Sequence, residues 1–195
     1  RIQAPKNLPV RPTTDRSKEG LFNILQHRLD FKSIQVLDLF AGTGSISYEF
    51  SSRGTKHVSA IDQNRSCVQF IKKVSYDLEM KIIAIQEECF RFLEQNSISY
   101  DLIFADPPYN FEIDDYKKII LLSKKSLSKK GIVIIEHFKQ IKLSEIQGFS
   151  FDRVYGNNVF SFFITIFLFA HNFSIGCFFY GQKRRNNYSI YLFLK

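Results

Sequence analysis

The sequence predicts an α/β fold, a doubly wound sheet that ends in an antiparallel hairpin, and two patterns carry this prediction. Short apolar segments alternate with longer amphipathic segments from residue 34 to residue 136. That alternation is typical of strands that lie side by side with helices covering the sheet. Two further apolar segments, 151–155 and 159–163, flank Gly156-Asn157-Asn158, a sequence suited to a tight turn between paired strands.

The chain is long enough for one domain with a sizeable core, and it is strongly basic. It has 195 residues, 45% of them hydrophobic, a formal net charge of +8 and a pI near 9.4. This charge favours a polyanionic partner, for which nucleic acid is the usual case. Cys67, Cys89 and Cys177 show no paired spacing, so we expect neither a disulfide framework nor a zinc site. No signal peptide is recognised, and the start at Arg1 rather than methionine suggests a fragment.

Residues 1–14 form an extended basic segment in this interpretation, and an amphipathic helix is expected to follow with Thr14 as its N-cap. Arg11, Arg16 and Lys18 crowd the start of this helix. Backbone N–H groups at a helix start combine with such cations to bind anions. A phosphate or carboxylate contact and a simple solvated face both stay open.

An apolar strand over 34–39 leads into Gly42-Thr43-Gly44, and a short helix is expected to follow. Glycines in such a turn let a ligand approach the backbone closely. The next strand ends in Asp62, about twenty residues on, where dinucleotide-binding folds carry a ribose-binding carboxylate. The turn lacks the third glycine of a pyrophosphate loop, and Asp38 just before it would repel pyrophosphate but attract a cationic amine. The pattern therefore favours S-adenosylmethionine over NAD, with a bare strand–turn–helix as the alternative.

The alternation continues along the middle of the chain. Glu87 and Glu88 follow an expected strand, and a carboxylate there can accept a hydrogen bond from an adenine amino group, with Glu88 the better placed. Both acids are also explained as first-turn residues that the helix dipole favours. The expected helices are 64–78, 87–95 and 114–127. The expected strands that alternate with them are 58–61, 81–85, 102–105 and 131–136.

Asp106-Pro107-Pro108-Tyr109 directly follows the apolar strand 102–105, so it leaves the carboxyl end of that strand, where open α/β sheets bind ligands. Consecutive prolines make a stiff loop whose carbonyls can act as acceptors. The Asp106 carboxylate and a proline carbonyl can accept from the amine edge of a base, and the Tyr109 ring offers a stacking face. A turn that merely ends the strand is the structural alternative.

Together, Arg11–Leu25, Asp38–Gly44, Asp62 and Asp106–Tyr109 resemble the RsmD-type methyltransferases, over about residues 1–163. The resemblance implies a Rossmann-like class I fold with a seven-stranded, mostly parallel sheet. It implies an enzyme that uses S-adenosylmethionine to methylate the exocyclic N2 amine of one guanine in small-subunit (16S) ribosomal RNA. The implied partner is ribosomal RNA in a nearly assembled small subunit, and the implied protein is a cytoplasmic monomer that needs no metal ion.

The resemblance also assigns roles by position. It supplies counterparts for the motif around the methionine end of the cofactor, the ribose-binding acid, the adenine-contacting pair and the catalytic loop. In that order they are Asp38, Phe40, Gly42 and Gly44; then Asp62; then Glu88 and Cys89; then Asp106, Pro107, Pro108 and Tyr109. Arg11, Thr13, Asp15 and Arg16 match its N-terminal motif, and the residues expected to bind RNA are Arg11, Arg16 and Lys18. Asp106 is counted among the cofactor contacts as well.

The chemistry expected at the loop follows from the target amine. An exocyclic amine on an aromatic base is a poor nucleophile because its lone pair is delocalised into the ring. Hydrogen bonds from its two N–H groups to Asp106 and to the Pro107 carbonyl would free that lone pair for in-line attack on a methyl group, helped mainly by positioning. The base must be flipped out to reach the loop, with Tyr109 stacking on it.

Three segments are expected along the chain. They are an N-terminal basic segment and helix at 1–30, a methyltransferase domain at 31–163, and an atypical Phe-rich tail at 164–195. The tail shows no α/β pattern, and a frameshifted or read-through segment is the preferred interpretation. The uncharged run over 159–180 is long enough for a membrane anchor, which is the second interpretation. The strand expected at the start of this run argues against it. A packed extension is the third interpretation.

Two other functions stay open. DNA adenine-N6 methyltransferases share the amine chemistry and a similar Pro-Pro-aromatic loop, but they commonly carry a separate target-recognition domain for which this chain has no room. A non-catalytic cofactor-binding or RNA-binding module is the alternative from a different class.

Overall fold

The computed structural model describes residue 2 and residues 15–164 of the chain. Thr14 and Arg11 of the predicted basic segment lie outside the described residues, and so does the predicted tail apart from Ile164. The proposed domain boundaries near residues 30 and 163 therefore stay predictions.

Seven strands form one mixed sheet, which confirms the predicted α/β class with a terminal antiparallel hairpin. In chain order the strands are β1 (Gln35–Leu39), β2 (His57–Asp62), β3 (Ile82–Gln86), β4 (Tyr100–Ala105), β5 (Leu127–Phe138), β6 (Phe149–Tyr155) and β7 (Asn158–Ile164). Across the sheet they lie in the order β3-β2-β1-β4-β5-β7-β6. The first five pair in parallel, and β7 pairs antiparallel with β5 and β6. The strand order reverses between β1 and β4, which is where such sheets bind ligands.

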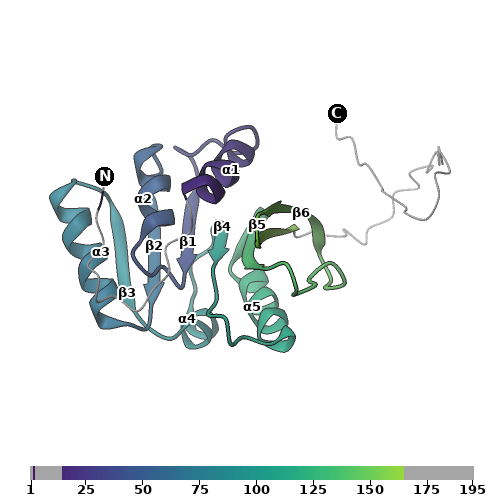
Figure 1. Cartoon of the computed structure of the whole chain (residues 1–195). Helices are drawn as coiled ribbons and strands as arrows, with labels where there is room; N and C mark the ends of the chain where they lie inside the picture. The colour runs from purple at the N-terminus through teal and green to yellow at the C-terminus, as the bar shows by residue number, and fades with distance from the viewer. Residues whose placement is uncertain (1, 3–14, 165–195) are drawn as a thin grey trace, which may run out of the picture.

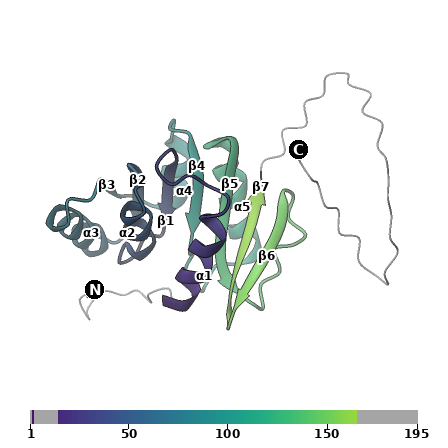
Figure 2. The same ribbon diagram turned by 90° about the horizontal axis from the view of Figure 1, so that it is seen from above.

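Helices cover both faces of the sheet. Those in the described part of the chain are α1 (Asp15–Leu25), α2 (Ser45–Ser52), α3 (Arg65–Asp77), α4 (Cys89–Gln95) and α5 (Ile113–Lys125). α1, α2 and α3 pack on one face, and α4 and α5 pack on the other (Figure 1). Seen from above, α1 lies beside the hairpin of β6 and β7 (Figure 2). The central strands are therefore buried on both sides.

α3 shows how local sequence sets a helix boundary. The Asn64 side chain accepts hydrogen bonds from the main-chain N–H groups of Ser66 and Cys67, so it satisfies two donors that the first turn leaves unpaired. Val68 and Ile71 follow at helical spacing, and both are buried against the sheet. The predicted inward face of this helix is confirmed.

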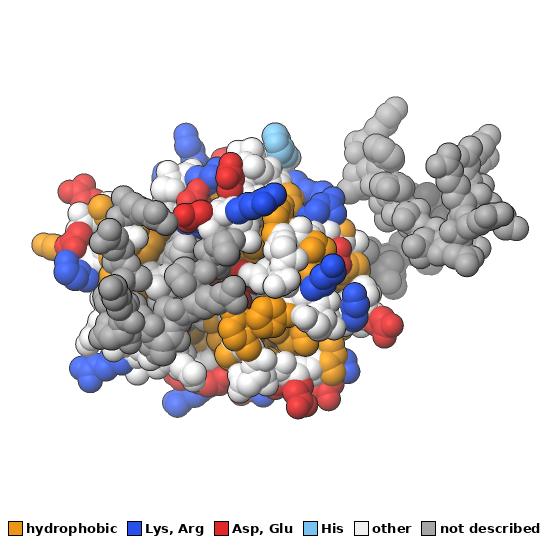
Figure 3. Space-filling view, viewed as in Figure 1, with side chains coloured by type: hydrophobic (Ala, Val, Ile, Leu, Met, Phe, Trp, Pro, Cys, Tyr) orange, Lys and Arg blue, Asp and Glu red, His pale blue; other side chains and the backbone are white. Residues whose placement is uncertain are grey.

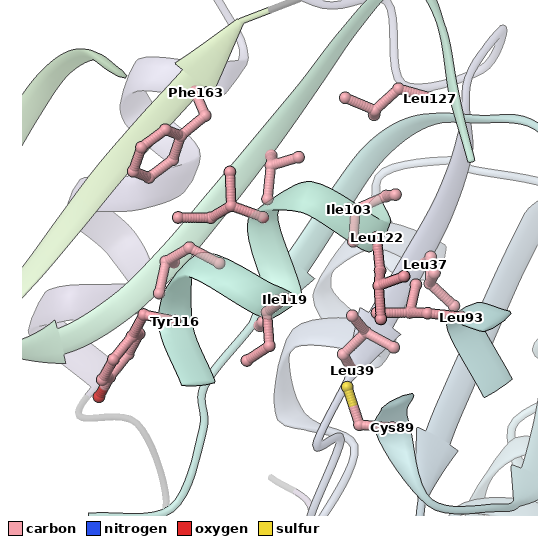
Figure 4. Close-up of a cluster of buried hydrophobic side chains, with 14 of the residues drawn as sticks. Leu37, Leu39, Cys89, Leu93, Ile103, Tyr116, Ile119, Leu122, Leu127 and Phe163 are labelled. Atoms are coloured by element: carbon pink, nitrogen blue, oxygen red, sulfur yellow. The ribbon is translucent and has the colours of Figure 1, made fainter. Parts of the chain in front are cut away.

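A continuous apolar cluster lies between the sheet and the helices α4 and α5 (Figure 4). Leu39 of β1, Ile103 of β4 and Ile119 of α5 are fully buried in it. Cys89 belongs to the same cluster, and in the close-up its sulfur lies near Leu39 and Leu93. This packing fixes α4 and α5 against the strand ends that carry the candidate site.

The boundary between α5 and β5 differs from the prediction of a helix through residue 127 and a strand from residue 131. The helix ends at Lys125 with Ser126 as its C-cap, and β5 begins at Leu127. Leu127 is buried and pairs with Tyr100 of β4, and the register shifts after this pair. Burial of Leu127 starts the strand at a residue that helix propensity had assigned to the end of the helix. The strand therefore also includes the lysine-rich residues 128–130.

No helix in the described ranges is long and apolar enough to cross a membrane. The uncharged run over 159–180, for which a membrane anchor was considered, begins within β7. As predicted, its first residues form a strand of the central sheet. The rest of that run lies outside the described residues.

β7 is an aromatic strand buried between two paired neighbours. Phe160 and Phe162 point into the cluster that also holds α1, and Phe163 points into the cluster under α5. All three rings are fully buried. The strand therefore joins the hairpin to both layers of the core.

We expect Phe162→Ala to lower the free energy of unfolding by about 3–5 kcal/mol, because it removes a buried ring and leaves a cavity. Val154→Ala on the neighbouring strand β6 is the control. Val154 is 52% exposed, so this change should stay within about 0.5 kcal/mol. Denaturant unfolding followed by circular dichroism measures both. Equal effects of the two substitutions would contradict the placement of β7 in the core.

Candidate active site

Three predicted motifs meet at one edge of the sheet. Leu39 at the end of β1 pairs with Ile61 on one side and with Ala105 on the other. The next residues along the three strands are Phe40, Asp62 and Asp106, and so the loops that they begin leave the same edge. The parallel register brings together the glycine-rich turn, the predicted ribose-binding acid Asp62 and the Pro-Pro loop.

The glycine turn, residues 40–44, has a backbone that few side chains tolerate. Gly42 and Gly44 have φ angles of 54° and 81°, and Phe40 has a φ angle of 60°. A Cβ at Gly44 would lie 2.8 Å from Tyr48 Cζ and 2.9 Å from Ile71 Cγ1. Glycine is therefore required at position 44 by both conformation and space. At Phe40 a left-handed backbone costs on the order of 1–3 kcal/mol, and such strain is typical of ligand-binding turns.

Asp62 ties this turn to the end of β2. Its Oδ2 accepts a hydrogen bond of 2.8 Å from Gly42 N, and its Oδ1 accepts one of 2.8 Å from Asn64 N. Each carboxylate oxygen has a second acceptor position, so the group is oriented by the backbone and can still accept from a ribose diol. This geometry fits the predicted ribose role.

Asp38 is buried, with only 1% of its surface exposed. Its Oδ2 accepts hydrogen bonds from Ser47 N at 3.1 Å and from Ser47 Oγ at 2.6 Å, which ties β1 to the first turn of α2. Burial raises the pKa of Asp38 to about 7; the Ser47 hydrogen bonds oppose this rise, and the nearby Asp62 charge adds to it. The Asp38 side chain therefore links the strand and the helix on either side of the glycine turn. Its contact with a cofactor amine stays a prediction.

Glu88 and Cys89 begin α4 at the same edge. Glu88 is the N-cap, and its two carboxylate oxygens accept from Phe90 N at 3.0 Å and from Arg91 N at 2.9 Å. The sequence had offered a first-turn acid as the alternative to adenine binding, and the structure places Glu88 just before the first turn, as the N-cap. The Cys89 side chain is buried in the core, so a contact with adenine at this position would have to come from its main chain.

The Pro-Pro loop, residues 106–109, continues directly from β4. The Pro108 carbonyl accepts a 3.1 Å hydrogen bond from Phe111 N, so the carbonyl on which the amine prediction relies is that of Pro107. Tyr109 is 61% exposed, and its ring stacks on Phe138 with centroids 4.5 Å apart and an interplanar angle of 27°. The predicted stacking side chain is thus held on one face by a residue that the sequence had not singled out.

Sequence reasoning missed two further groups at this edge. The Phe111 ring lies 5.6 Å from Phe40 and 6.0 Å from Phe90, so it joins the glycine turn, α4 and the Pro-Pro loop. Burial raises the pKa of Tyr116 to about 12, with a smaller contribution from the Asp106 charge. The proximity of Tyr116 to Asp106 depends on how α5 packs, and no local pattern signals it.

The N-terminal cations divide between the described and undescribed parts of the chain. Arg11 lies outside the described residues, and Arg16 is exposed on α1. Lys18 Nζ lies 3.1 Å from Ser45 Oγ and donates to it, at the start of α2 beside the glycine turn. Lys18 therefore lies beside the glycine turn, and RNA binding by Arg16 and Lys18 stays a prediction.

Within the residues that the structure describes, no cluster of His, Cys, Asp and Glu is arranged to hold a metal ion. Cys67 and Cys89 are both buried free thiols, and Cys177 lies outside the described residues.

The raised pKa of Asp38 predicts a pH dependence of stability. Between pH 3.8, the ordinary value for the unfolded chain, and about 7, the folded state holds a proton that the unfolded state has lost. Stability must therefore fall as the pH rises through this window, by up to roughly 4 kcal/mol. Asp38→Asn removes the titration and keeps an acceptor for Ser47, so it should flatten this decline and be more stable than the unsubstituted protein at pH 8.

Chemical denaturation of both proteins at pH 5 and pH 8 measures this effect. A variant whose stability falls between these two pH values as steeply as that of the unsubstituted protein would show that Asp38 is not the group responsible.

Comparison with known proteins identifies the family. Residues 1–164 match the family model described as Conserved hypothetical protein 95. A Haemophilus influenzae protein named Ribosomal RNA small subunit methyltransferase D is 30% identical over 132 residues, which is 65% of this chain and 67% of that protein. A Buchnera aphidicola protein (subspecies Acyrthosiphon pisum) of the same name is 30% identical over 138 residues, 69% of this chain and 71% of that protein.

The fold is shared with solved methyltransferase structures. The 16S rRNA N2 methyltransferase RsmC from Thermus thermophilus, in complex with AdoMet and guanosine, superimposes with a TM-score of 0.66 at 20% identity. The match covers 82% of this chain and 45% of that one, and at this identity it concerns the fold alone. Because the family model spans most of the chain and both relatives are matched over two thirds of their length or more, this chain belongs to the RsmD-type methyltransferase family.

Proposed function

We propose that this chain transfers a methyl group from S-adenosylmethionine to the exocyclic N2 amine of a guanine in small-subunit (16S) ribosomal RNA. The family and the names of its relatives support a ribosomal RNA substrate. One structural observation carries the proposal. The pairing of Leu39 with both Ile61 and Ala105 sets the glycine turn and Asp62 beside the Pro-Pro loop.

The cofactor would lie across the carboxyl ends of β1 and β2. Gly42 and Gly44 allow its methionine end to approach the backbone, and the first turn of α2 offers N–H groups to the carboxylate. Asp62, fixed by Gly42 N and Asn64 N, accepts from the ribose hydroxyls. S-adenosylmethionine supplies a methyl group on a positively charged sulfur, which makes that carbon electrophilic.

The target amine would lie against the Pro-Pro loop. The Asp106 carboxylate accepts from one N–H of the amine, and the Pro107 carbonyl accepts from the other. These hydrogen bonds draw the nitrogen toward a tetrahedral shape, and its lone pair is then directed out of the ring plane. The base reaches the loop as an unpaired, flipped-out nucleotide and stacks on Tyr109.

The basic surface fits a partner made of ribosomal RNA. The chain carries a formal net charge of +8, and on the face shown in Figure 3 Lys and Arg side chains are interspersed with Asp and Glu around an exposed group of hydrophobic side chains. Such a field attracts a phosphate backbone without reading its sequence. Within this proposal the protein acts as a cytoplasmic monomer on the small subunit and uses no metal ion in the transfer.

Methyl transfer from radiolabelled cofactor, followed by nucleoside analysis, tests the function. Small ribosomal subunits, naked 16S RNA and duplex DNA are offered in parallel. We expect N2-methylguanosine from a ribosomal substrate and no label in DNA. Label recovered as N6-methyladenine would support a DNA methyltransferase instead, and absence of transfer to all three substrates would support a non-catalytic module.

Asp62→Ala should weaken S-adenosylmethionine binding by about 1.5–3 kcal/mol, the range for hydrogen bonds to charged groups. Calorimetry measures the affinity. Asp77→Ala, which removes an exposed carboxylate from the far end of α3, is the matched control and should leave the affinity unchanged. Unchanged affinity in a folded Asp62→Ala variant would remove Asp62 from the cofactor site.

Asp106→Ala should bind the cofactor and lose most of its turnover, because the partner of this carboxylate is the target amine. Asp106→Asn should also be slow, since one position of its amide donates where the amine requires an acceptor. Single-turnover rates on small subunits, with cofactor affinity measured alongside, test both variants. If the Asn variant were as fast as the unsubstituted enzyme, Asp106 would not act by accepting from the amine.

A further inference from the structure

Tyr109 does not stand alone at the carboxyl edge of the sheet. Its ring stacks on Phe138, the last residue of β5. We name these two side chains the aromatic pair. Tyr109 belongs to the Pro-Pro loop after β4, and β4 pairs directly with β5. The pair therefore joins the catalytic loop to the neighbouring strand at the place where a target base must lie.

The main chain at Phe138 is held from several sides. Phe138 pairs with Asn158 across β5 and β7. The Phe138 carbonyl accepts from Ile141 N at 3.0 Å, and Lys139 N donates to the Asn157 carbonyl at 3.0 Å. Phe138 is thus a fixed support, whereas Tyr109 is an exposed side chain of a loop.

His137 adds a second support from inside the sheet. Its Nδ1 lies 2.9 Å from the Phe138 carbonyl, and its Nε2 lies 2.7 Å from Ser161 Oγ on β7. A carbonyl only accepts, so Nδ1 carries the proton, and Nε2 of the neutral ring accepts from the Ser161 hydroxyl. Burial lowers the pKa of His137, which agrees with a neutral ring in this position.

We propose that Phe138 is a positioning residue of the target-base site, and that the aromatic pair forms a platform on which the flipped-out guanine stacks. This inference rests on the function proposed above. Tyr109 keeps 61% of its surface exposed while Phe138 covers one of its faces. In this proposal the base stacks on the exposed part of the Tyr109 ring, and its amine then lies toward Asp106 at the start of the same loop.

The platform works by limiting the freedom of Tyr109. An exposed tyrosine samples several rotamers, and a base that stacks on it must first select one. Phe138 restricts the ring before the base arrives, while the two prolines restrict the backbone beneath it. Base–aromatic stacking contributes enough binding that losing an ordered ring lowers kcat/KM for RNA by about ten-fold or more.

Two measurements on the full chain test the platform. The first compares kcat/KM for small subunits and cofactor affinity in Phe138→Ala and Phe138→Leu. The second uses Tyr109→Trp, which introduces the only tryptophan of the chain, and follows its fluorescence anisotropy decay with and without Phe138→Ala. Phe149→Ala is the matched control. Phe149 is also a partly buried phenylalanine that contacts another ring, that of Phe163, but it begins β6 at the opposite edge of the sheet.

We expect Phe138→Ala to lower kcat/KM by about ten-fold or more at unchanged cofactor affinity, and to add a fast local motion to the indole. The kcat/KM of Phe138→Leu should lie between that of Phe138→Ala and that of the unsubstituted enzyme. Phe149→Ala should change neither kcat/KM nor the motion of the indole. Unchanged kcat/KM together with an unchanged anisotropy decay would overturn the platform. So would a loss of kcat/KM that Phe149→Ala reproduces. If the unsubstituted enzyme transferred no methyl group to guanine, the proposed function would fail, and the anisotropy decay would still decide whether Phe138 immobilises the ring.

Discussion

The parallel pairing of β1 with β2 on one side and β4 on the other is the constraint on which the site depends. It places Phe40, Asp62 and Asp106 at the same edge. The hydrogen bond from Gly42 N to Asp62 then converts this register into a fixed turn. If β4 moved by one residue, its side chains would change faces and Asp106 would no longer follow the residue that pairs with Leu39. The register of the sheet therefore also determines which residues meet in the candidate site.

Much of this site could be predicted because its residues have local reasons for their places. Gly44 occupies a left-handed backbone that leaves no room for a side chain, and prolines 107 and 108 stiffen a loop that directly follows a buried strand. Such requirements can be recognised from a few consecutive residues. The fold class could likewise be predicted from a local pattern, the alternation of strands and helices along the chain. The boundary of β5 was missed because burial of Leu127 against Tyr100 outweighed helix propensity.

The residues that escaped prediction act across the sheet. Phe138 meets Tyr109, Tyr116 lies near Asp106, and His137 bonds to Ser161, each through elements that are distant in the sequence. Glu88 shows the opposite difficulty. Its place after a strand suggested adenine binding and a first-turn acid alike, and the structure shows it as the N-cap of α4. In both cases the missing information was the partner of the side chain, which only tertiary packing defines.

A structure of the chain bound to S-adenosylhomocysteine, the product cofactor, tests the central claim most directly. The account predicts both ribose hydroxyls within about 3.0 Å of the Asp62 carboxylate, a normal hydrogen-bond distance. It also predicts the sulfur on the side of the Pro-Pro loop, facing Asp106. A cofactor bound away from Asp62, or with its sulfur directed away from Asp106, would contradict it.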